Sequence, residues 1–218
     1  MILAIETATD VCSVAFKNES GEIFEERIQS RGSHSEKLFL FIKALMKVHQ
    51  FSVDDLDAVL VSEGPGSYTG LRIAASGVKG LLFGSEVPLY GIPTLASFAG
   101  AVLKKEPPPS RIHAIIDARR KHVYHQQFSV IDNQLRAESA VNTIEITALE
   151  AALEDDDCLM GTGIDRFSKK VRGSIKTHAK KIISATSLIE LYQLKANNFT
   201  HKISPAQFDP EYYTSKQT

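Results

Sequence analysis

The order in which short apolar runs alternate with helix-forming segments constrains the fold of this 218-residue chain most strongly. Residues 1–28 contain three short β-branched or apolar runs separated by turn residues, which predicts three antiparallel strands. Residues 36–49 are continuous helix formers that follow a candidate N-cap at Ser33 or Ser35, and residues 55–64 have the pattern of a buried strand. A glycine-rich loop, a helix over 69–84, a short strand over 88–93 and a helix over 94–105 complete this half. The pattern predicts an α/β fold.

A similar order begins again after the triple proline at 107–109, which stops a helix and stiffens the chain. Strands are predicted over 111–117, 122–130, 134–138 and 158–163, and helices over 147–154, 165–171 and 187–197. The tail from His201 has no strong pattern. We therefore expect a duplicated α/β fold with a shrunken second half, divided into residues 1–106 and a smaller α/β domain of residues 110–218.

Charge and cysteine content exclude several classes of protein. The 25 Lys and Arg residues are balanced by 26 Asp and Glu residues, whereas a protein that binds nucleic acid alone usually has a basic excess. The two cysteines are far apart, which excludes a disulfide framework. No apolar run has the length of a membrane span, and the N-terminus lacks the features of a secretion signal. We expect a cytoplasmic protein with no membrane partner.

The helices over 36–49 and 69–84 both lack a broad polar side. The second has only Arg72 and Lys79 as charges, and its small residues form a ridge on which another helix can lie closely, although each glycine costs up to about 1 kcal/mol of helix stability. Two interpretations stay open: both helices are buried within one domain, or one face packs on a partner subunit. We predict oligomerisation. The predicted interface residues are Leu38, Phe41, Ile42, Leu45, Gly70, Ile73, Ala74, Gly77 and Leu81.

One loop and two turns are candidate phosphate or nucleotide sites. The loop GPGSYTGLR joins a strand end to a helix start, where free backbone N–H groups hold anions, although it is not a Walker A loop. The turn after the first strand has Ala8 where a phosphate-binding hairpin normally has glycine, and DARRK opens the second half. Ordinary turns, with Thr69 as a helix N-cap, remain the alternative for each. The candidate residues are Glu6, Thr7, Gly64, Gly66, Ser67, Thr69, Asp117 and Arg119.

Catalytic and metal-binding patterns are lacking in the sequence. The seven histidines form no HExxH or HxxxH pair, no GxSxG elbow is present, and neither cysteine has a basic partner nearby in sequence. We predict no metal site and no cofactor. The densest basic stretch, residues 169–181, is either a solvated face or a contact to an RNA backbone.

Taken together, MILAIETATDVCSVAF, GSHSEKLF, SEGPGSYTGLRIAASGVKGL, GIPTLASFA, IIDARRKHVY and LMGTG resemble the TsaB (YeaZ) family over nearly all of residues 1–165. The resemblance implies the fold of the actin-like ATPase and sugar kinase superfamily, a duplicated RNase H-like core. It also implies a role in making threonylcarbamoyladenosine next to the tRNA anticodon. There a TsaB-like subunit pairs with the catalytic paralogue TsaD, a TsaE-like ATPase joins them, and contact with tRNA is indirect or weak. The family forms homodimers through the two helices described above.

The resemblance further implies a non-catalytic subunit. The catalytic paralogue has two histidines four residues apart in the segment that corresponds to GIPTLASF, and this chain has Thr94 and Phe98 there. Two departures from the family are Arg120-Lys121-His122 after the DAR motif and the absence of the arginine that usually follows Pro-x-Tyr near the C-terminus. The main alternative is an autonomous ATP-dependent enzyme of the kinase class, in which Glu6, Asp117 and the glycine loop line a cleft. A metal-dependent hydrolase is less favoured.

Overall fold

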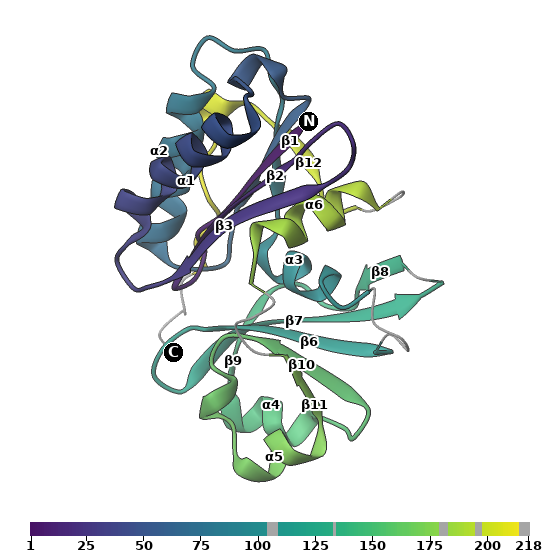
Figure 1. The fold of residues 1–218 in the computed structure, drawn as a ribbon. Helices are drawn as coiled ribbons and strands as arrows, with labels where there is room; N and C mark the ends of the chain where they lie inside the picture. Colours follow the sequence, from purple (N-terminus) through teal and green to yellow (C-terminus); the bar gives the residue numbers. More distant parts are fainter. Residues whose placement is uncertain (104–108, 133, 179–182, 195–197, 214–218) are drawn as a thin grey trace. The chain divides into compact units, whose positions relative to one another are not determined.

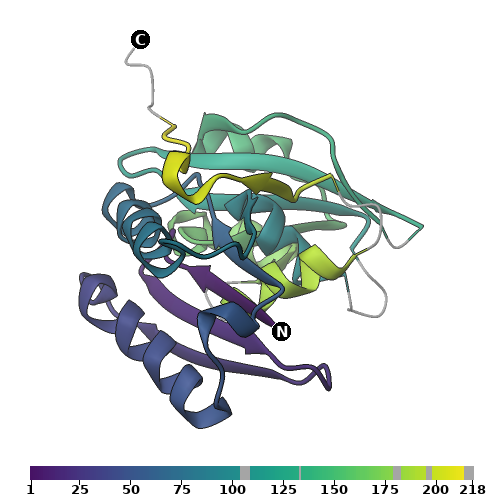
Figure 2. The same ribbon diagram turned by 90° about the horizontal axis from the view of Figure 1, so that it is seen from above.

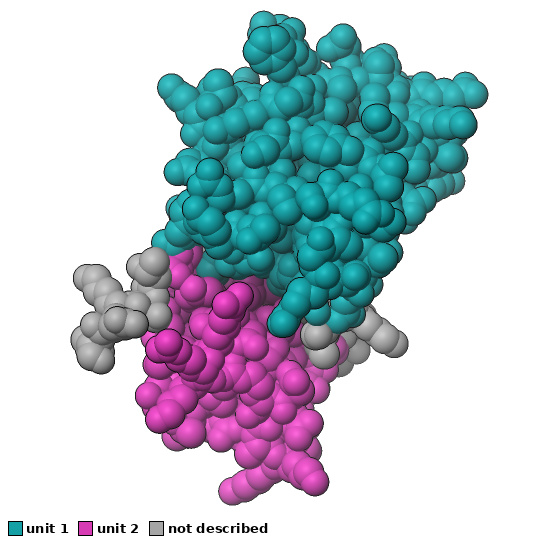
Figure 3. Space-filling model, turned by 90° about the vertical axis from the view of Figure 1, so that its left-hand side faces the viewer, with its two compact units in different colours: residues 1–94, 184–212 teal, residues 95–183, 213–218 magenta. Residues whose placement is uncertain are grey.

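The computed structural model describes residues 1–103, 109–132, 134–178, 183–194 and 198–213. The chain forms two compact units, coloured separately in Figure 3: residues 1–94 with 184–212, and residues 95–183 with 213–218. We call them unit 1 and unit 2. Among the described helices, none is long and apolar enough to cross a membrane.

Unit 1 is built on a six-stranded mixed sheet with the strand order β12-β5-β4-β1-β2-β3. The three N-terminal strands are antiparallel, as predicted, while β4 runs parallel to β1 and β5 parallel to β4. The C-terminal strand β12 pairs antiparallel with β5. The strands are β1 (Ile2–Glu6), β2 (Val11–Lys17), β3 (Ile23–Gln29), β4 (Ala58–Ser62), β5 (Leu89–Ile92) and β12 (His201–Ile203).

Helices cover both faces of this sheet. Figures 1 and 2 show α1 and α2 side by side on one face and α6 on the other. The core contains residues of β1, β2 and β4 together with Leu38 and Ile42 of α1 and Ala74 and Val78 of α2. The helical segments of unit 1 are α1 (His34–His49), η1 (Val53–Asp55), α2 (Tyr68–Leu81), α6 (Ala185–Gln193) and η4 (Pro205–Gln207).

Unit 2 repeats this plan in smaller form. Its sheet has the order β11-β10-β6-β7-β8, which matches β5-β4-β1-β2-β3 strand for strand and in direction, and β9 pairs with β7. The predicted duplication of an RNase H-like core with a smaller second half is confirmed. The elements are α3 (Thr94–Gly100), β6 (Arg111–Asp117), β7 (His122–Ile131), β8 (Gln134–Ala137), β9 (Asn142–Glu145), α4 (Ile146–Ala152), β10 (Asp157–Gly161), η2 (Ile164–Arg166), α5 (Lys169–Ser174) and β11 (Lys176–His178).

The division of the chain differs from the contiguous boundary predicted between residues 106 and 110. Residues 184–212 return to unit 1, because β12 extends its sheet and α6 packs on β1 and β2. Residues 95–103, predicted in the first domain, belong to unit 2. Local sequence patterns could not predict either difference, because both depend on contacts between segments that are far apart in the chain. Residues 104–108, which include most of the triple proline, lie outside the described residues.

Several element boundaries also differ from the prediction; for example, the helix predicted over 94–105 ends at Gly100. Helix α2 begins at Tyr68 with Ser67, not Thr69, as its N-cap, because the Ser67 hydroxyl accepts from the Gly70 N–H. The helix predicted over 165–171 is split into η2 and α5 by a second cap at Ser168. Helix α6 ends at Gln193 instead of residue 197.

Candidate functional site

Glu6 lies at the end of β1 with its side chain fully buried. Its Oε1 accepts a hydrogen bond from the Ala8 N–H over 2.6 Å, which fixes the turn that follows the strand. Burial raises the pKa of Glu6 to about 7, although the hydrogen bond from the Ala8 N–H and the nearby Ser62 hydroxyl favour the ionised form. In unit 1, Glu6 therefore holds the turn from inside and is not presented to solvent.

The glycine loop lies directly on this turn. Ser67 N–H donates to the Ala8 carbonyl over 2.7 Å, and the Thr7 hydroxyl donates to the Gly70 carbonyl over 2.9 Å. A Cβ on Gly66 would lie 2.4 Å from the Ala8 carbonyl oxygen. On Gly70 it would lie 2.0 Å from the Thr7 carbonyl oxygen. The glycines thus allow two backbone segments to touch, and at these contacts protein atoms occupy the space between loop and turn.

The remaining predicted phosphate residues are distributed over two units. Gly64 is buried and Thr69 is exposed in unit 1, whereas Asp117 and Arg119 belong to the β6–β7 turn of unit 2. Asp117 forms an ion pair with Arg166 and accepts from the Arg119 N–H over 2.8 Å. The structure brings Glu6, Thr7, Gly66 and Ser67 together, with Asp117 next to Arg119 in the other unit.

The C-terminal segment packs beside the same loop. Glu211 N–H donates to the Glu63 carbonyl over 2.7 Å, and a Cβ on Gly64 would lie 2.4 Å from the Glu211 carbonyl oxygen. The Glu63 carboxylate is buried, with its Oε2 3.1 Å from His201 Nε2. Burial and the nearby charge of Glu211 raise the pKa of Glu63 to about 7. The tail that showed no pattern in sequence therefore docks on the glycine loop.

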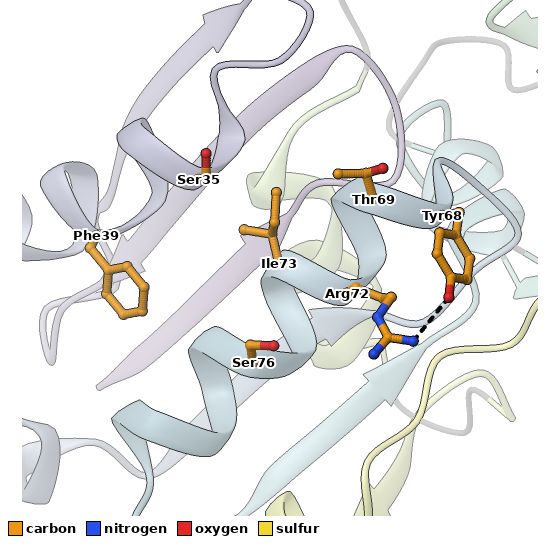
Figure 4. Close-up of a pocket in the computed structure, with 7 residues that line it drawn as sticks. All are labelled: Ser35, Phe39, Tyr68, Thr69, Arg72, Ile73 and Ser76. Atoms are coloured by element: carbon orange, nitrogen blue, oxygen red, sulfur yellow. Dashed lines mark hydrogen bonds between the residues drawn. The ribbon is translucent and has the colours of Figure 1, made fainter.

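A hollow of about 370 Å³ opens between α1 and α2 (Figure 4). Phe39 from α1 and Ile73 from α2 point toward the space between the helices. At one end of the hollow, Arg72 Nη1 donates to the Tyr68 hydroxyl over 3.0 Å. The Tyr68 ring also lies 4.9 Å from that of Tyr212. The lining residues are Ser35, Phe39, Tyr68, Thr69, Arg72, Ile73 and Ser76.

The residues predicted for a partner interface divide into two groups. Phe41, Ile73 and Leu81 are partly buried at the edge of the unit 1 core. The others are buried within the unit: Leu38, Ile42, Leu45, Gly70, Ala74 and Gly77. A helical wheel does not distinguish these groups, because it cannot tell which apolar side faces the sheet.

Different side chains form the exposed part of this face. Phe39 is 44% exposed, Leu40 51%, Tyr68 59% and Phe83 91%. Leu40 was detectable in sequence, since it falls within the otherwise polar stripe of its helix. Phe83 follows the end of α2, where helical periodicity gives no information.

The small-residue ridge of α2 is used in two ways. A Cβ on Gly77 would lie 3.0 Å from Leu38 Cδ2, so this glycine allows α1 to approach α2. Gly80, one turn further on, has nothing within 4 Å of the same position. The close packing predicted from the ridge is thus found within the chain at Gly77, while Gly80 faces open space.

The structure describes no group of three or more His, Cys, Asp or Glu side chains that could hold a metal ion. Thr94 and Phe98 are buried, and the Thr94 hydroxyl accepts from the Gly64 N–H over 3.2 Å. In unit 2, His113 Nδ1 lies 2.9 Å from His125 Nε2, and His113 Nε2 lies 3.2 Å from Asp157. Burial lowers the pKa of His125 to about 4 and also lowers the pKa of His113, which favours the neutral form of both imidazoles.

Several known proteins are similar to this chain in sequence or in structure. The family model described as "TsaD: tRNA N6-adenosine threonylcarbamoyltransferase" matches residues 23–204. The "tRNA threonylcarbamoyladenosine biosynthesis protein TsaB" of Buchnera aphidicola subsp. Baizongia pistaciae is 30% identical over 94% of this chain and 96% of its own length. The chain belongs to the TsaB family.

Other TsaB proteins agree with this assignment. The Haemophilus influenzae TsaB is 26% identical over 100% of this chain and 94% of its own. The Escherichia coli TsaB is 33% identical over 61% of this chain, a match that spans 56% of the E. coli protein. The solved structure titled "YeaZ from Pseudomonas aeruginosa" has a TM-score of 0.79 and 24% identity, and covers 97% of this chain and 99% of that one. The TsaB resemblance and the actin-like ATPase fold are both confirmed.

Proposed function

We propose that the chain is the non-catalytic scaffold subunit of the assembly that installs threonylcarbamoyl on the tRNA adenosine next to the anticodon. It pairs with a catalytic TsaD-like paralogue, a TsaE-like ATPase joins the pair, and the chain forms a homodimer when alone. Membership of the TsaB family supports the assignment to tRNA modification, because its curated relatives are named for threonylcarbamoyladenosine biosynthesis.

The distribution of exposed apolar side chains carries the proposal of a scaffold. Among the described residues, seven large hydrophobic side chains are exposed, and five of them come from α1, α2 or the residues just after α2. Exposed apolar side chains concentrated on two neighbouring helices favour an interface in soluble proteins. The five are Phe39, Leu40, Val48, Tyr68 and Phe83.

Gly80 supports the same face. A glycine within a helix costs up to about 1 kcal/mol of stability relative to alanine. Around Gly80, nothing lies within 4 Å of the position that a Cβ would take. A partner helix lying against Gly80 and the nearby Phe83 explains why the glycine is tolerated there.

The packing of the glycine loop supports a non-catalytic role. Glu6 is buried, and Gly66 and Gly70 bring the loop into contact with the turn where a kinase-class enzyme needs space for phosphates. Thr94 and Phe98 cannot act as the imidazole ligands of the catalytic paralogue. These features favour the scaffold over the autonomous ATP-dependent enzyme.

Light scattering after size exclusion tests the proposal, on the chain alone and mixed with the TsaD-like protein of the same organism. We expect a homodimer that converts to a heteromeric complex. The variant Phe83→Glu should lose both associations and keep its melting temperature, since Phe83 is 91% exposed.

Ile131→Glu is the matched control, because Ile131 is a 43% exposed apolar residue of unit 2 and belongs to neither α1 nor α2. It should pair as the parent chain does. A parent chain that stays monomeric and ignores the TsaD-like protein would show that the apolar face has another purpose and would overturn the scaffold proposal.

A further inference from the structure

Unit 2 has a concentration of positive charge that the proposed pairing does not use. Segments 117–122 and 164–176 contain eight Lys and Arg residues but only two acidic residues, Asp117 and Asp165, whereas the whole chain has a net charge of −1. The excess of positive charge in these two segments is therefore balanced by acidic residues elsewhere in the chain.

The two segments adjoin in space. Arg166 of η2 forms an ion pair with Asp117 and its Nη1 lies 3.5 Å from the His122 carbonyl oxygen, so it binds both ends of the β6–β7 turn. A Cβ on Gly163 would lie 3.2 Å from the Asp117 Cβ. The turn and the segment leading into α5 are therefore neighbours within one unit.

Seven of the eight cations are exposed and form no ion pair with a described acidic residue. Two nearby acidic side chains have other contacts, since Glu145 faces His122 at 3.9 Å and Glu150 accepts from the Ser168 N–H. We call six of them the cationic surface: Arg119, Arg120, Lys121, Lys169, Lys170 and Arg172. Lys176 is not included, because it opens β11 opposite Cys158, which pairs with Ile112 near the start of β6 and not with the end that leads into the turn.

The chemistry of this surface fits phosphate groups better than a protein or a lipid core. None of the large exposed hydrophobic side chains of the described chain lies in either segment. A protein interface or a membrane-inserting face needs such residues at its centre. Clustered Arg and Lys side chains without apolar neighbours are the pattern of nucleic-acid backbone contact, in which Arg binds phosphate oxygens through two N–H groups.

We propose that the cationic surface binds the phosphate backbone of the tRNA that is to be modified. This inference rests on the proposed function, in which tRNA is the substrate of the assembly. It replaces the indirect or weak tRNA contact expected from the sequence with a direct one. The contact is independent of base sequence, because phosphate contacts position a nucleic acid without reading it.

Binding of fluorescein-labelled tRNA to the full chain, measured by anisotropy between 50 and 200 mM salt, tests the inference. Replacing Arg119, Arg120 and Lys121 together by Gln should weaken binding at 100 mM salt at least about tenfold. The same triple variant should lower the slope of log affinity against log salt by about 2 to 3. The corresponding change of Lys169, Lys170 and Arg172 should have the same effect.

The matched control replaces three exposed cations outside the surface by Gln: Arg31, Arg136 and Lys202. It should bind tRNA as the parent does. Equal losses in the control, or no tRNA binding by the parent at 50 mM salt, would overturn the inference. So would equal binding to phosphatidylserine vesicles, since the surface would then not distinguish the phosphates of a nucleic acid from those of a lipid surface.

Pairing with the TsaD-like protein is measured on the same variants. Both Gln triples should still pair, because the surface lies in unit 2 and the proposed pairing face lies on α1 and α2 of unit 1. A chain that binds tRNA through this surface but does not pair would overturn the proposed function alone. Melting temperatures of all the variants identify any loss caused by misfolding.

Discussion

Burial of Glu6 makes the stability of the folded chain depend on pH through a single carboxylate. Its pKa is about 7 in the folded chain and 4.5 in the unfolded chain, so between these values the folded state binds more protons. The contribution of Glu6 to stability therefore falls as the pH rises from 4.5 to 7 and is constant above that range. The loss amounts to about 3 kcal/mol, from 1.36 kcal/mol for each pKa unit.

Glu6→Gln should remove this dependence, because the amide stays neutral while its Oε1 still accepts from the Ala8 N–H. The free energy of unfolding of the variant minus that of the parent should rise by about 3 kcal/mol between pH 4.5 and 7.5, measured with urea. Exposed Glu19→Gln serves as the control. A Glu6→Gln difference that does not vary with pH would contradict the buried, raised-pKa carboxylate.

At the scale of the element, two of the three glycines of α2 have opposite surroundings. Gly70→Ala should destabilise the chain by more than about 2 kcal/mol, since its Cβ would lie 2.0 Å from the backbone oxygen of Thr7 and neither segment can move away easily. Gly80→Ala should stabilise the free chain by about 0.5 to 1 kcal/mol, because nothing lies within 4 Å. Thermal melting of both variants checks the pair of expectations.

The second variant also tests the pairing face. Where a partner lies on Gly80, the added methyl group obstructs its approach, so Gly80→Ala should weaken homodimer formation while it raises the melting temperature. A variant that is more stable and pairs as tightly as the parent would place the interface elsewhere on α1 and α2.

Elements were predictable where their signals are local. The antiparallel strands β1–β3, the helix α1 and the repeated order in unit 2 follow from periodicity and turn residues. The exposed face was not predictable in detail, because Leu45 and Phe39 have the same character in sequence but are 4% and 44% exposed. Their difference depends on which side of α1 meets the sheet, a tertiary fact that one sequence does not contain.

At the scale of the whole molecule, unit 1 is completed by segments from both ends of the chain. A fragment of residues 1–106 should fail to unfold cooperatively, since it leaves uncovered the sheet face that α6 packs on and the β5 edge that β12 pairs with. Adding a peptide of residues 184–212 should restore a cooperative transition in circular dichroism. A fragment of residues 1–106 that unfolds cooperatively without the peptide would support the contiguous boundary predicted between residues 106 and 110.

The return of residues 184–212 to unit 1 also governs how the chain folds as it is made. The first 94 residues emerge from the ribosome early. The helix α6 and the strand β12, which complete their sheet, are synthesised only after residues 95–183. At typical rates of translation this delay is on the order of 10 s. During that time a nascent sheet has an apolar face and an unpaired edge open to other chains, so expression at high rate and high temperature should favour aggregation over the native fold.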